Sequence, residues 1–488
     1  MATTPENAKL PPSSAIKHVD WQDFRDHLST ADVEGRRLWL YPRQPKGRFT
    51  GARRWLSYVL IAVMFAGPFI HINGNPLLLM NVVERKFSIL GQMFWPQDGA
   101  ILAFGLLLFL TGIAVFTAAF GRLWCGWACP QTVMMEMVFR RIEYAIEGDA
   151  HTQRALAKAP WTGGKFAKKL TKHGIFLALS FVIGNTLLAY IIGDEQLLRL
   201  VTDDPRQHLQ GLGFMLLFAL VFYAIFARFR EQACTFICPY GRFQSVLLDE
   251  NSIVVAYDHK RGERRGKLRR HQTLEQRRAE GQGDCIECRQ CVAVCPTGID
   301  IRDGTQMECV HCTACIDACD AVMDKVGRPR GLIRYASLNG IERGEKLRIT
   351  PRLVGYCAIL LALGCGLVAL LLTRSDVDVT LLRTPGALFQ QAAEGRISNL
   401  YQLKLVNKTT HDLPVELRLE QPADGWMTVF GGTRVAAQQL LQTSVLVELS
   451  PAQFPGGTAD VVVGVYAEGK RLSRFKTGFI GPRGEAAH

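Results

Sequence analysis

Eight cysteines of this chain form two copies of one four-cysteine motif. In each copy two residues separate the first three cysteines from one another, and three residues separate the third from the fourth. The copies are Cys285, Cys288, Cys291 and Cys295, and Cys309, Cys312, Cys315 and Cys319. With this spacing one tight loop wraps three corners of a [4Fe-4S] cluster, and the fourth ligand comes from the other copy. The sequence therefore predicts two [4Fe-4S] clusters, one bound by Cys285, Cys288, Cys291 and Cys319 and the other by Cys309, Cys312, Cys315 and Cys295.

Zinc is the alternative metal for these eight cysteines. Structural zinc sites usually use two separated cysteine pairs per ion, whereas here four cysteines lie within eleven residues. The second motif departs from the first because Asp320 follows its last cysteine where Pro296 follows in the first. We expect this change to alter a turn and a cluster potential without removing a ligand. We expect His311 to be a surface or hydrogen-bonding residue, because the cysteines already complete both ligand sets.

Four further cysteines form two pairs of a second motif, CxxxCP. The pairs are Cys125 and Cys129, and Cys234 and Cys238, each followed by proline. If a helix continues through the second cysteine, the spacing places both sulfurs on one helix face, and the proline then stops or kinks the helix. Four converging soft thiolates favour Cu(I), zinc or an iron-sulfur centre. The alternative is inert packing at helix ends, but the repetition of the motif favours a redox or metal role.

Three other residues that could bind a metal have simpler interpretations. Cys357 and Cys365 lie in an apolar stretch, where cysteine usually acts as a buried hydrophobic residue. His71 lies near the end of an apolar stretch, and a histidine at a membrane interface needs no metal to explain it.

The composition places these cysteines in a membrane protein. Hydrophobic residues make up 48% of the 488 residues and charged residues only 21%, which excludes a disordered chain and disfavours a uniformly soluble enzyme. Five apolar stretches approach the ~20 residues that a bilayer-spanning helix needs. They cover residues 55–73, 100–120, 174–193, 211–229 and 353–373. The polar segment 1–54 precedes the first stretch, which indicates an internal signal anchor and not a cleaved signal peptide.

The distribution of basic residues predicts the orientation in the membrane. Lys and Arg number 10 before the first span, 2 in residues 74–99, 9 in residues 121–173 and 2 in residues 194–210. By the positive-inside rule the N-terminus and both CxxxCP pairs face the cytoplasm, and an odd number of spans sends the C-terminus outside. This topology accounts for the net charge of +13, so no nucleic-acid partner is expected.

Two soluble regions complete the predicted organisation. Residues 230–352 contain no span and form a cytoplasmic domain, with the ferredoxin module at about 275–330. After the fifth span at 353–373, residues 374–488 contain alternating stretches at 401–406, 415–419, 444–449 and 460–466, separated by Gly, Pro and Asp. This pattern predicts a small antiparallel sandwich that serves as an interaction or spacer domain.

Several longer segments resemble the FixG/RdxA/CcoG family of cytochrome c oxidase accessory proteins. The segments are residues 116–132, 295–302, 314–319 and 329–335, and the resemblance extends over nearly the whole chain. It implies a bacterial inner-membrane protein with a five-helix transmembrane core, an inserted α+β bacterial two-cluster ferredoxin domain and a periplasmic, all-β immunoglobulin-like sandwich at the C-terminus. It also implies a role in biogenesis of the cbb-type oxidase, through reduction of Cu(II) to Cu(I).

Position by position, the resemblance makes the eight ferredoxin cysteines electron-relay ligands. The candidate copper or redox site is Cys125, Cys129, Cys234 and Cys238. The expected partners are membrane lipid, a cytoplasmic electron donor, and oxidase assembly factors or a copper chaperone. Two alternatives stay open: a quinol-linked membrane ferredoxin that supplies a respiratory reductase, and a non-catalytic assembly scaffold whose clusters are structural or sensory.

Overall fold

The computed structural model describes residues 30, 34 and 36–482, except for 83–84, 270–271, 346–348, 376, 385–387, 393–394, 410, 433 and 468. The chain forms two compact units. One contains residues 1–66, 107–188 and 197–362, and the other contains residues 67–106, 189–196 and 363–488.

Among the described residues, four helices are long and apolar enough to cross a membrane, so the chain is a membrane protein. They are α2 (Gly99–Phe120), α7 (Gly163–Ile192), α9 (Leu209–Ala224) with its π-helical continuation Ile225–Phe229, and α16 (Pro351–Leu372). These helices correspond to the predicted spans at 100–120, 174–193, 211–229 and 353–373, although α7 begins eleven residues before its predicted span. In the first unit α2 and α16 approach closely, since a Cβ atom on Gly112 would contact Leu360 at 3.7 Å.

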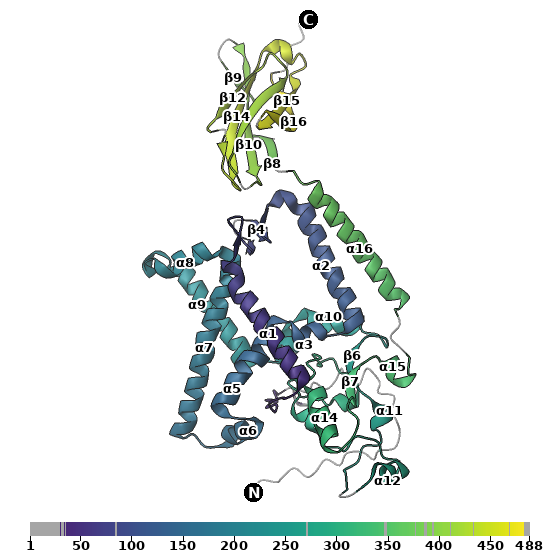
Figure 1. Ribbon diagram of the computed structural model, residues 1–488. Helices are drawn as coiled ribbons and strands as arrows, with labels where there is room; N and C mark the ends of the chain where they lie inside the picture. The colour runs from purple at the N-terminus through teal and green to yellow at the C-terminus, as the bar shows by residue number, and fades with distance from the viewer. Residues whose placement is uncertain are drawn as a thin grey trace. The chain divides into compact units, whose positions relative to one another are not determined.

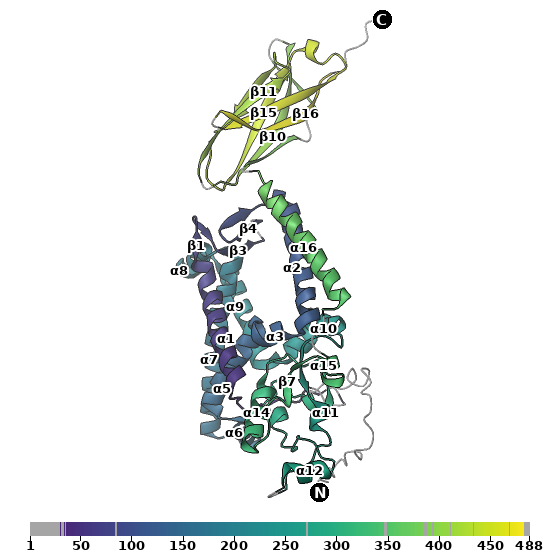
Figure 2. The ribbon, with the colours of Figure 1, turned by 45° about the vertical axis from the view of Figure 1, so that its right-hand side comes forward.

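The predicted first span at 55–73 is wrong in its extent, and the count of five is not confirmed. Helix α1 (Arg48–Ala66) begins earlier and ends earlier, and it is followed by the 3-10 turn Gly67–Phe69. Arg53 and Arg54 occupy its first half, so its apolar part is short. Helices α1, α7 and α9 lie side by side (Figures 1 and 2), with Phe139 packed between them at 4.8 Å from Phe176 and 4.2 Å from Phe226, measured between ring centroids.

Short helices connect the membrane helices in the first unit. After α2 follow α3 (Leu123–Trp127), α4 (Pro130–Met134), the π turn Met135–Phe139, α5 (Arg140–Glu147) and α6 (Ala150–Lys158). Before α9 lie α8 (Asp194–Thr202) and the 3-10 turn Pro205–Gln207, and after it lie the π turn Ala233–Ile237 and α10 (Pro239–Leu247).

The inserted ferredoxin domain is built on a two-stranded antiparallel sheet of β6 (Val254–Tyr257) and β7 (Ile333–Ala336). Its helices are α11 (His259–Gly262), α12 (Leu274–Ala279), α13 (Gln290–Ala293), the 3-10 turn Ile301–Asp303, α14 (Ala314–Lys325) and α15 (Leu338–Glu342). Apolar side chains including Val255, Met323 and Leu332 form its core together with cysteines of both motifs.

In the second unit, residues 377–480 form the predicted antiparallel sandwich. One sheet has the order β12-β14-β10-β8, with β9 also on β10, and the other has the order β13-β11-β15-β16. The strands are β8 (Val377–Arg383), β9 (Gln390–Gln391), β10 (Ile397–Asn407), β11 (Leu413–Gln421), β12 (Trp426–Phe430), β13 (Arg434–Val435), β14 (Leu440–Leu449), β15 (Thr458–Ala467) and β16 (Lys470–Ile480), with a 3-10 turn at Pro451–Gln453. The predicted alternating stretches lie in β10, β11, β14 and β15, and their inward residues form one core.

The second unit also contains two small sheets before α2. They are β1 (His71–Ile72) with β2 (Asn75–Pro76), and β3 (Leu78–Asn81), β4 (Lys86–Ile89) and β5 (Gln92–Phe94), followed by the 3-10 turn Pro96–Asp98. Asp98, which is buried, pairs with Arg374 at 2.8 Å and with Lys408, and Lys408 also pairs with Asp378 at 2.6 Å.

Candidate iron-sulfur and thiol site

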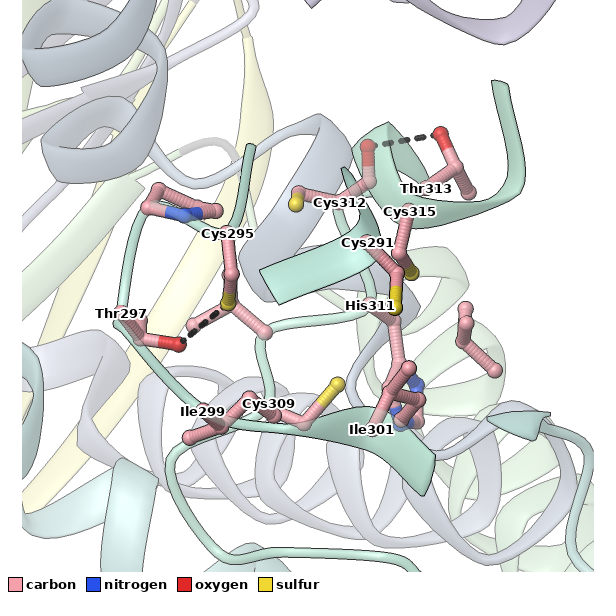
Figure 3. Close-up of a pocket in the computed structure, with 13 residues that line it drawn as sticks. Cys291, Cys295, Thr297, Ile299, Ile301, Cys309, His311, Cys312, Thr313 and Cys315 are labelled. Carbon is pink, nitrogen blue, oxygen red and sulfur yellow. Dashed lines mark hydrogen bonds between the residues drawn. The ribbon is translucent and has the colours of Figure 1, made fainter. Parts of the chain in front are cut away.

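Two cavities in the ferredoxin domain are lined by cysteines. The walls of one cavity contain Cys285, Cys288, Cys291 and Cys319; the walls of the other contain Cys295, Cys309, Cys312 and Cys315, together with Cys291. Figure 3 shows the second cavity, with sulfur atoms of its cysteines directed toward a shared space. The cavities hold about 340 and 350 Å³ between atoms, their open mouths included. Each cavity thus draws cysteines from both motifs.

The two cysteine loops use the same local backbone. The residues on both sides of the second cysteine of each motif have left-handed φ angles: Glu287 (54°) and Arg289 (53°) beside Cys288, and His311 (52°) and Thr313 (65°) beside Cys312. Such angles are uncommon for residues other than glycine, and here they turn the loop around its cavity. Helix α14 then carries Cys315 and Cys319 one turn apart, facing different cavities.

The surroundings of these thiols fit iron-sulfur clusters. Burial raises the pKa of Cys295 and of Cys309, and neighbouring backbone N–H groups partly oppose the rise, those of Thr297, Gly298 and Ile299 at Cys295 and that of His311 at Cys309. Burial raises the pKa of Cys309 and of Cys319 to about 12, so a cationic centre is what can hold these sulfurs as thiolates. Buried thiolates that accept N–H donors are the ligand set that holds a [4Fe-4S] cluster and tunes its potential.

The four CxxxCP cysteines lie at helix junctions and not on continuous helix faces. Helix α3 ends at Trp127, and the π turn after α9 ends at Ile237, so each pair is interrupted before its second cysteine. Cys129 (φ −61°, ψ 124°) and Cys238 (φ −77°, ψ 110°) are extended and precede Pro130 and Pro239, which begin new helices. The condition of an unbroken helix is therefore not met, because proline is favoured at the first helical position.

The two junctions repeat one arrangement. In each, a membrane helix ends at a residue with a left-handed φ, Gly121 (57°) after α2 and Arg230 (53°) after α9. A five-residue helical turn with the first cysteine follows, then the second cysteine, then a helix that begins with proline.

Contacts between the repeats bring the two junctions together. Cys125 Sγ donates to Gln244 Oε1 at 3.3 Å, and Gln244 belongs to α10, which begins directly after Cys238. Arg122 donates to the same Gln244 oxygen at 2.7 Å and to the Gly241 carbonyl at 2.8 Å.

The charges of the thiols act on one another across the two junctions. Burial raises the pKa of Cys234 to about 12, and the charges of Cys129, Cys125 and Cys238 add to the rise. Among the described residues, however, no three Cys, His, Asp or Glu side chains lie close enough to hold one metal ion.

The thiol junction packs directly against the second ferredoxin motif. Cys125 shares a buried apolar cluster with Cys312, Val310, Val294 and Ala314. A Cβ atom on Gly126 would lie 2.3 Å from the Val310 carbonyl oxygen, so only glycine permits this approach.

Hydrogen bonds hold the same interface. Arg53 Nε, which is buried, donates to the Gly126 carbonyl at 2.5 Å, and Trp127 Nε1 donates to the Tyr335 hydroxyl at 3.1 Å. In the first turn of α14, Asp317 accepts hydrogen bonds from the backbone N–H groups of Phe49 and Thr50, at 3.0 and 2.6 Å, and thereby binds the start of α1.

His311 is buried, so the expectation of a surface position is wrong, and the expectation of a hydrogen-bonding role is confirmed. Its Nδ1 accepts from the backbone N–H of Arg122 at 3.1 Å. Burial, aided by the charge of Arg122, lowers the pKa of His311 to about 3, so the ring is neutral.

The other three predicted residues have surroundings of their own. Cys357 and Cys365 are exposed on α16, contrary to the expected burial, because in a membrane helix lipid and not protein can supply the apolar surroundings. His71 Nε2 lies 3.6 Å from Asp194.

Sequence reasoning missed Arg122, Gln244 and Arg53. For Arg122 the sequence contained a signal, because this charged residue stands at the end of an apolar stretch, three residues before Cys125. Arg230 stands in the corresponding place, four residues before Cys234.

Comparisons with known proteins agree with these domains. The family described as a 4Fe-4S dicluster domain matches residues 229–338, a family described as a 4Fe-4S binding domain matches residues 102–147, and the family described as the IG-like fold at the C-terminal of FixG matches residues 367–482. The fold and the site thus define an iron-sulfur electron-transfer protein of the membrane that carries two [4Fe-4S] clusters.

Whole-chain relatives identify its family. The chain is 36% identical to "Protein RdxA" of Cereibacter sphaeroides over 400 residues, which cover 79% of this chain and 82% of RdxA. It is 32% identical to "Nitrogen fixation protein FixG" of Rhizobium meliloti over 447 residues, 83% of this chain and 84% of FixG. The protein belongs to the FixG/RdxA family. A crystal structure of a FixG-related protein from Vibrio parahaemolyticus matches 22% of this chain and 98% of its own length, with 15% identity and a TM-score of 0.19.

Proposed function

We propose that this protein passes electrons from its cytoplasmic iron-sulfur clusters to the membrane surface, where they reduce Cu(II) to Cu(I) for assembly of a cbb-type oxidase. One observation carries the route: Cys125 of the membrane thiols and Cys312 of the ferredoxin motif share one buried apolar cluster. This direct packing keeps the two redox sites close together, and a short separation favours electron transfer between them. Copper is the substrate, and each ion takes one electron.

The proposed ligand sets follow the two cavities. Cys285, Cys288, Cys291 and Cys319 hold the first cluster, and Cys295, Cys309, Cys312 and Cys315 hold the second. Cys291 lies in the walls of both cavities, which supports two clusters that are close neighbours. The packing of Cys125 with Cys312 supports the second cluster as the one that faces the membrane thiols.

The electron leaves at Cys125, Cys129, Cys234 and Cys238. Sulfur ligands there stabilise Cu(I) and so favour the reduction of Cu(II). Binding of one copper ion by these thiols requires them to close around it, since in the described residues they are not spaced for a single ion.

The proposed topology retains α1 as a fifth span. Its 19 residues measure about 28 Å, close to the hydrocarbon thickness of a bilayer. Trp55, Val59 and Val63 are more than half exposed along it, as lipid-facing residues are. With five spans and the basic loops inside, the N-terminus and ferredoxin domain are cytoplasmic, and the immunoglobulin-like domain is periplasmic, where it meets oxidase assembly factors or a copper chaperone.

The test uses the full chain, purified without oxygen, with a reductant and Cu(II), and it follows Cu(I) with a colorimetric chelator. We expect turnover in the wild type and none in the double variant Cys125→Ala, Cys234→Ala, which retains the ferredoxin clusters. Copper reduction that is unchanged in the double variant contradicts the exit site. No copper reduction by the wild type supports a scaffold, and reduction that depends on quinol supports the quinol-linked relay.

A further inference from the structure

We propose that the three-stranded sheet β3-β4-β5, which precedes α2, lies on the phospholipid bilayer with one face in contact with lipid. The face consists of Leu78, Met80, Phe87 and Ile89. The segments that span the membrane are helices, so the sheet adds a second kind of membrane contact. The inference goes beyond the proposed function and does not depend on copper reduction.

The strand register defines this face. Residues that lie directly opposite each other in an antiparallel pair point to the same side of the sheet. Leu78 lies opposite Ile89, and Met80 lies opposite Phe87. Leu78, Met80 and Ile89 are 37, 53 and 44% exposed, and Phe87 is half-buried. An antiparallel sheet face in water usually carries polar side chains, whereas all four side chains here are apolar. This face therefore favours an apolar neighbour over water.

The other side of the sheet is covered by protein. Leu79, Asn81 and Ser88 alternate with the exposed residues along the strands, and all three are buried. Ser88 Oγ donates to the Pro76 carbonyl at 2.6 Å, and the two strand ladders pair backbone groups of all three strands. Non-helical backbone is tolerated beside lipid only where its polar groups are paired within the protein. These hydrogen bonds serve that requirement, and the outward side chains are left as the contact surface.

Continuity with the membrane helices identifies the neighbour as lipid. Strand β5 ends at Phe94 and α2 begins at Gly99, and β4 lies beside the start of α2 in both views of the ribbon (Figures 1 and 2). Of the described residues in the most apolar stretch of α2, none is buried, so that stretch is open to lipid. Arg374, two residues after α16, donates to the Met93 carbonyl of β5 at 2.5 Å and pairs with Asp98 at 2.8 Å. The ends of two membrane helices thus hold the sheet at the boundary of the bilayer.

The turns around the strands fit a membrane boundary as well. Val82, which follows β3, and Leu90, which follows β4, are 66 and 70% exposed, so the apolar surface extends past the strands. In residues 67–94 the three residues that are charged at neutral pH are consecutive, at Glu84, Arg85 and Lys86. Basic side chains at a membrane boundary reach the headgroup phosphates, while apolar neighbours contact the acyl chains. A phospholipid surface offers both of these contacts to one small sheet.

Photo-crosslinking in a bilayer of known composition tests the inference. The full chain, with p-benzoylphenylalanine in place of Met80, is irradiated in nanodiscs of phosphatidylcholine and phosphatidylglycerol, and mass spectrometry identifies what the benzophenone has bonded to. The matched positions are Leu107, which is 49% exposed on α2, and Glu416, whose side chain is 62% exposed on the sandwich. We expect lipid adducts at positions 80 and 107 and none at position 416. Lipid adducts at position 107 alone, or bonds from position 80 to a second copy of the chain, overturn the inference.

A measurement on the unaltered chain covers the case in which the Met80 variant fails to fold. Oxidants in water convert exposed methionine to its sulfoxide. In nanodiscs we expect Met80 to be protected from the membrane-impermeant oxidant peroxymonosulfate, and we expect that protection to be lost in the urea-denatured chain. Equal oxidation rates in the two states place Met80 in water and overturn the inference. Neither readout involves copper, so a failure of the proposed function leaves both results unchanged.

Discussion

The contact between Gly126 and the Val310 carbonyl allows a test of the electron route that leaves every cysteine in place. Gly126→Ala adds a Cβ atom 2.3 Å from the Val310 oxygen and 2.8 Å from the His311 carbonyl carbon and oxygen, whereas ordinary contact begins at 3.4 Å. All of these neighbours are backbone atoms, so α3 and the second motif must separate by about 1.1 Å. Overpacking of this kind costs about 1–3 kcal/mol, which is about 5- to 150-fold in an equilibrium constant.

The separation should weaken docking of the ferredoxin domain and slow electron transfer to the membrane thiols. We expect the temperature at which the visible cluster absorbance is lost to fall by about 4–12 °C at a fixed scan rate, taking ~4 °C per kcal/mol. Copper reduction should slow while the iron content at low temperature stays at the wild-type value.

Gly355→Ala is the matched control, because no atom lies within 4 Å of the added Cβ in α16. It should match the wild type or exceed it slightly, since alanine favours a helix over glycine by about 1 kcal/mol. If Gly126→Ala behaves like Gly355→Ala in both assays, the close packing of α3 on the second motif is not the electron route.

Three further predictions concern other contacts. Cys319→Ser should abolish the EPR signal of the first ferredoxin cluster; loss confined to the second cluster would refute the crossed ligand sets. Asp317→Ala removes the acceptor of the α1 N–H groups and should lower stability by about 1–2 kcal/mol, as seen in the thermal loss of cluster absorbance, whereas an unchanged midpoint shows that α1 is held elsewhere. Burial raises the pKa of Asp98, but the hydrogen bonds from Lys408 and Arg374 outweigh it and lower the pKa, so this carboxylate stabilises the second unit above pH ~4 and ceases to do so as pH falls through the lowered pKa. Asp98→Asn should therefore destabilise the unit at pH 7 and flatten its acid unfolding curve; a curve parallel to that of the wild type contradicts this assignment.

Residue spacing and periodicity were sufficient to predict features that depend on residues close together in the sequence. The ferredoxin loops are short, so the positions of Cys285 to Cys295 in the sequence already determine what they can surround. The alternating residues of β10 and β14 likewise decide which side chains face the sandwich core. Apolar length located α2, α9 and α16 to within two residues.

Such patterns could not predict contacts between residues that are far apart in the sequence. Hydropathy alone treats Arg53 as a polar residue at a membrane helix end, whereas in the fold its guanidinium is buried against Gly126. The burial of His311 depends on residues 189 positions away, at Arg122. The break before Cys129 could have been anticipated, because a proline that follows a cysteine fits the start of a new helix better than the continuation of an old one.

The single helical turn from Cys315 to Cys319 has a mechanical consequence. Its middle residue, Asp317, holds the first residues of α1, while the cysteines at its ends face the two cavities. If α1 is the fifth span proposed above, a bilayer thinner or thicker than this helix changes its tilt. The strain then reaches the turn that joins the two redox centres, and cluster potentials measured in short-chain and long-chain lipids would register membrane thickness.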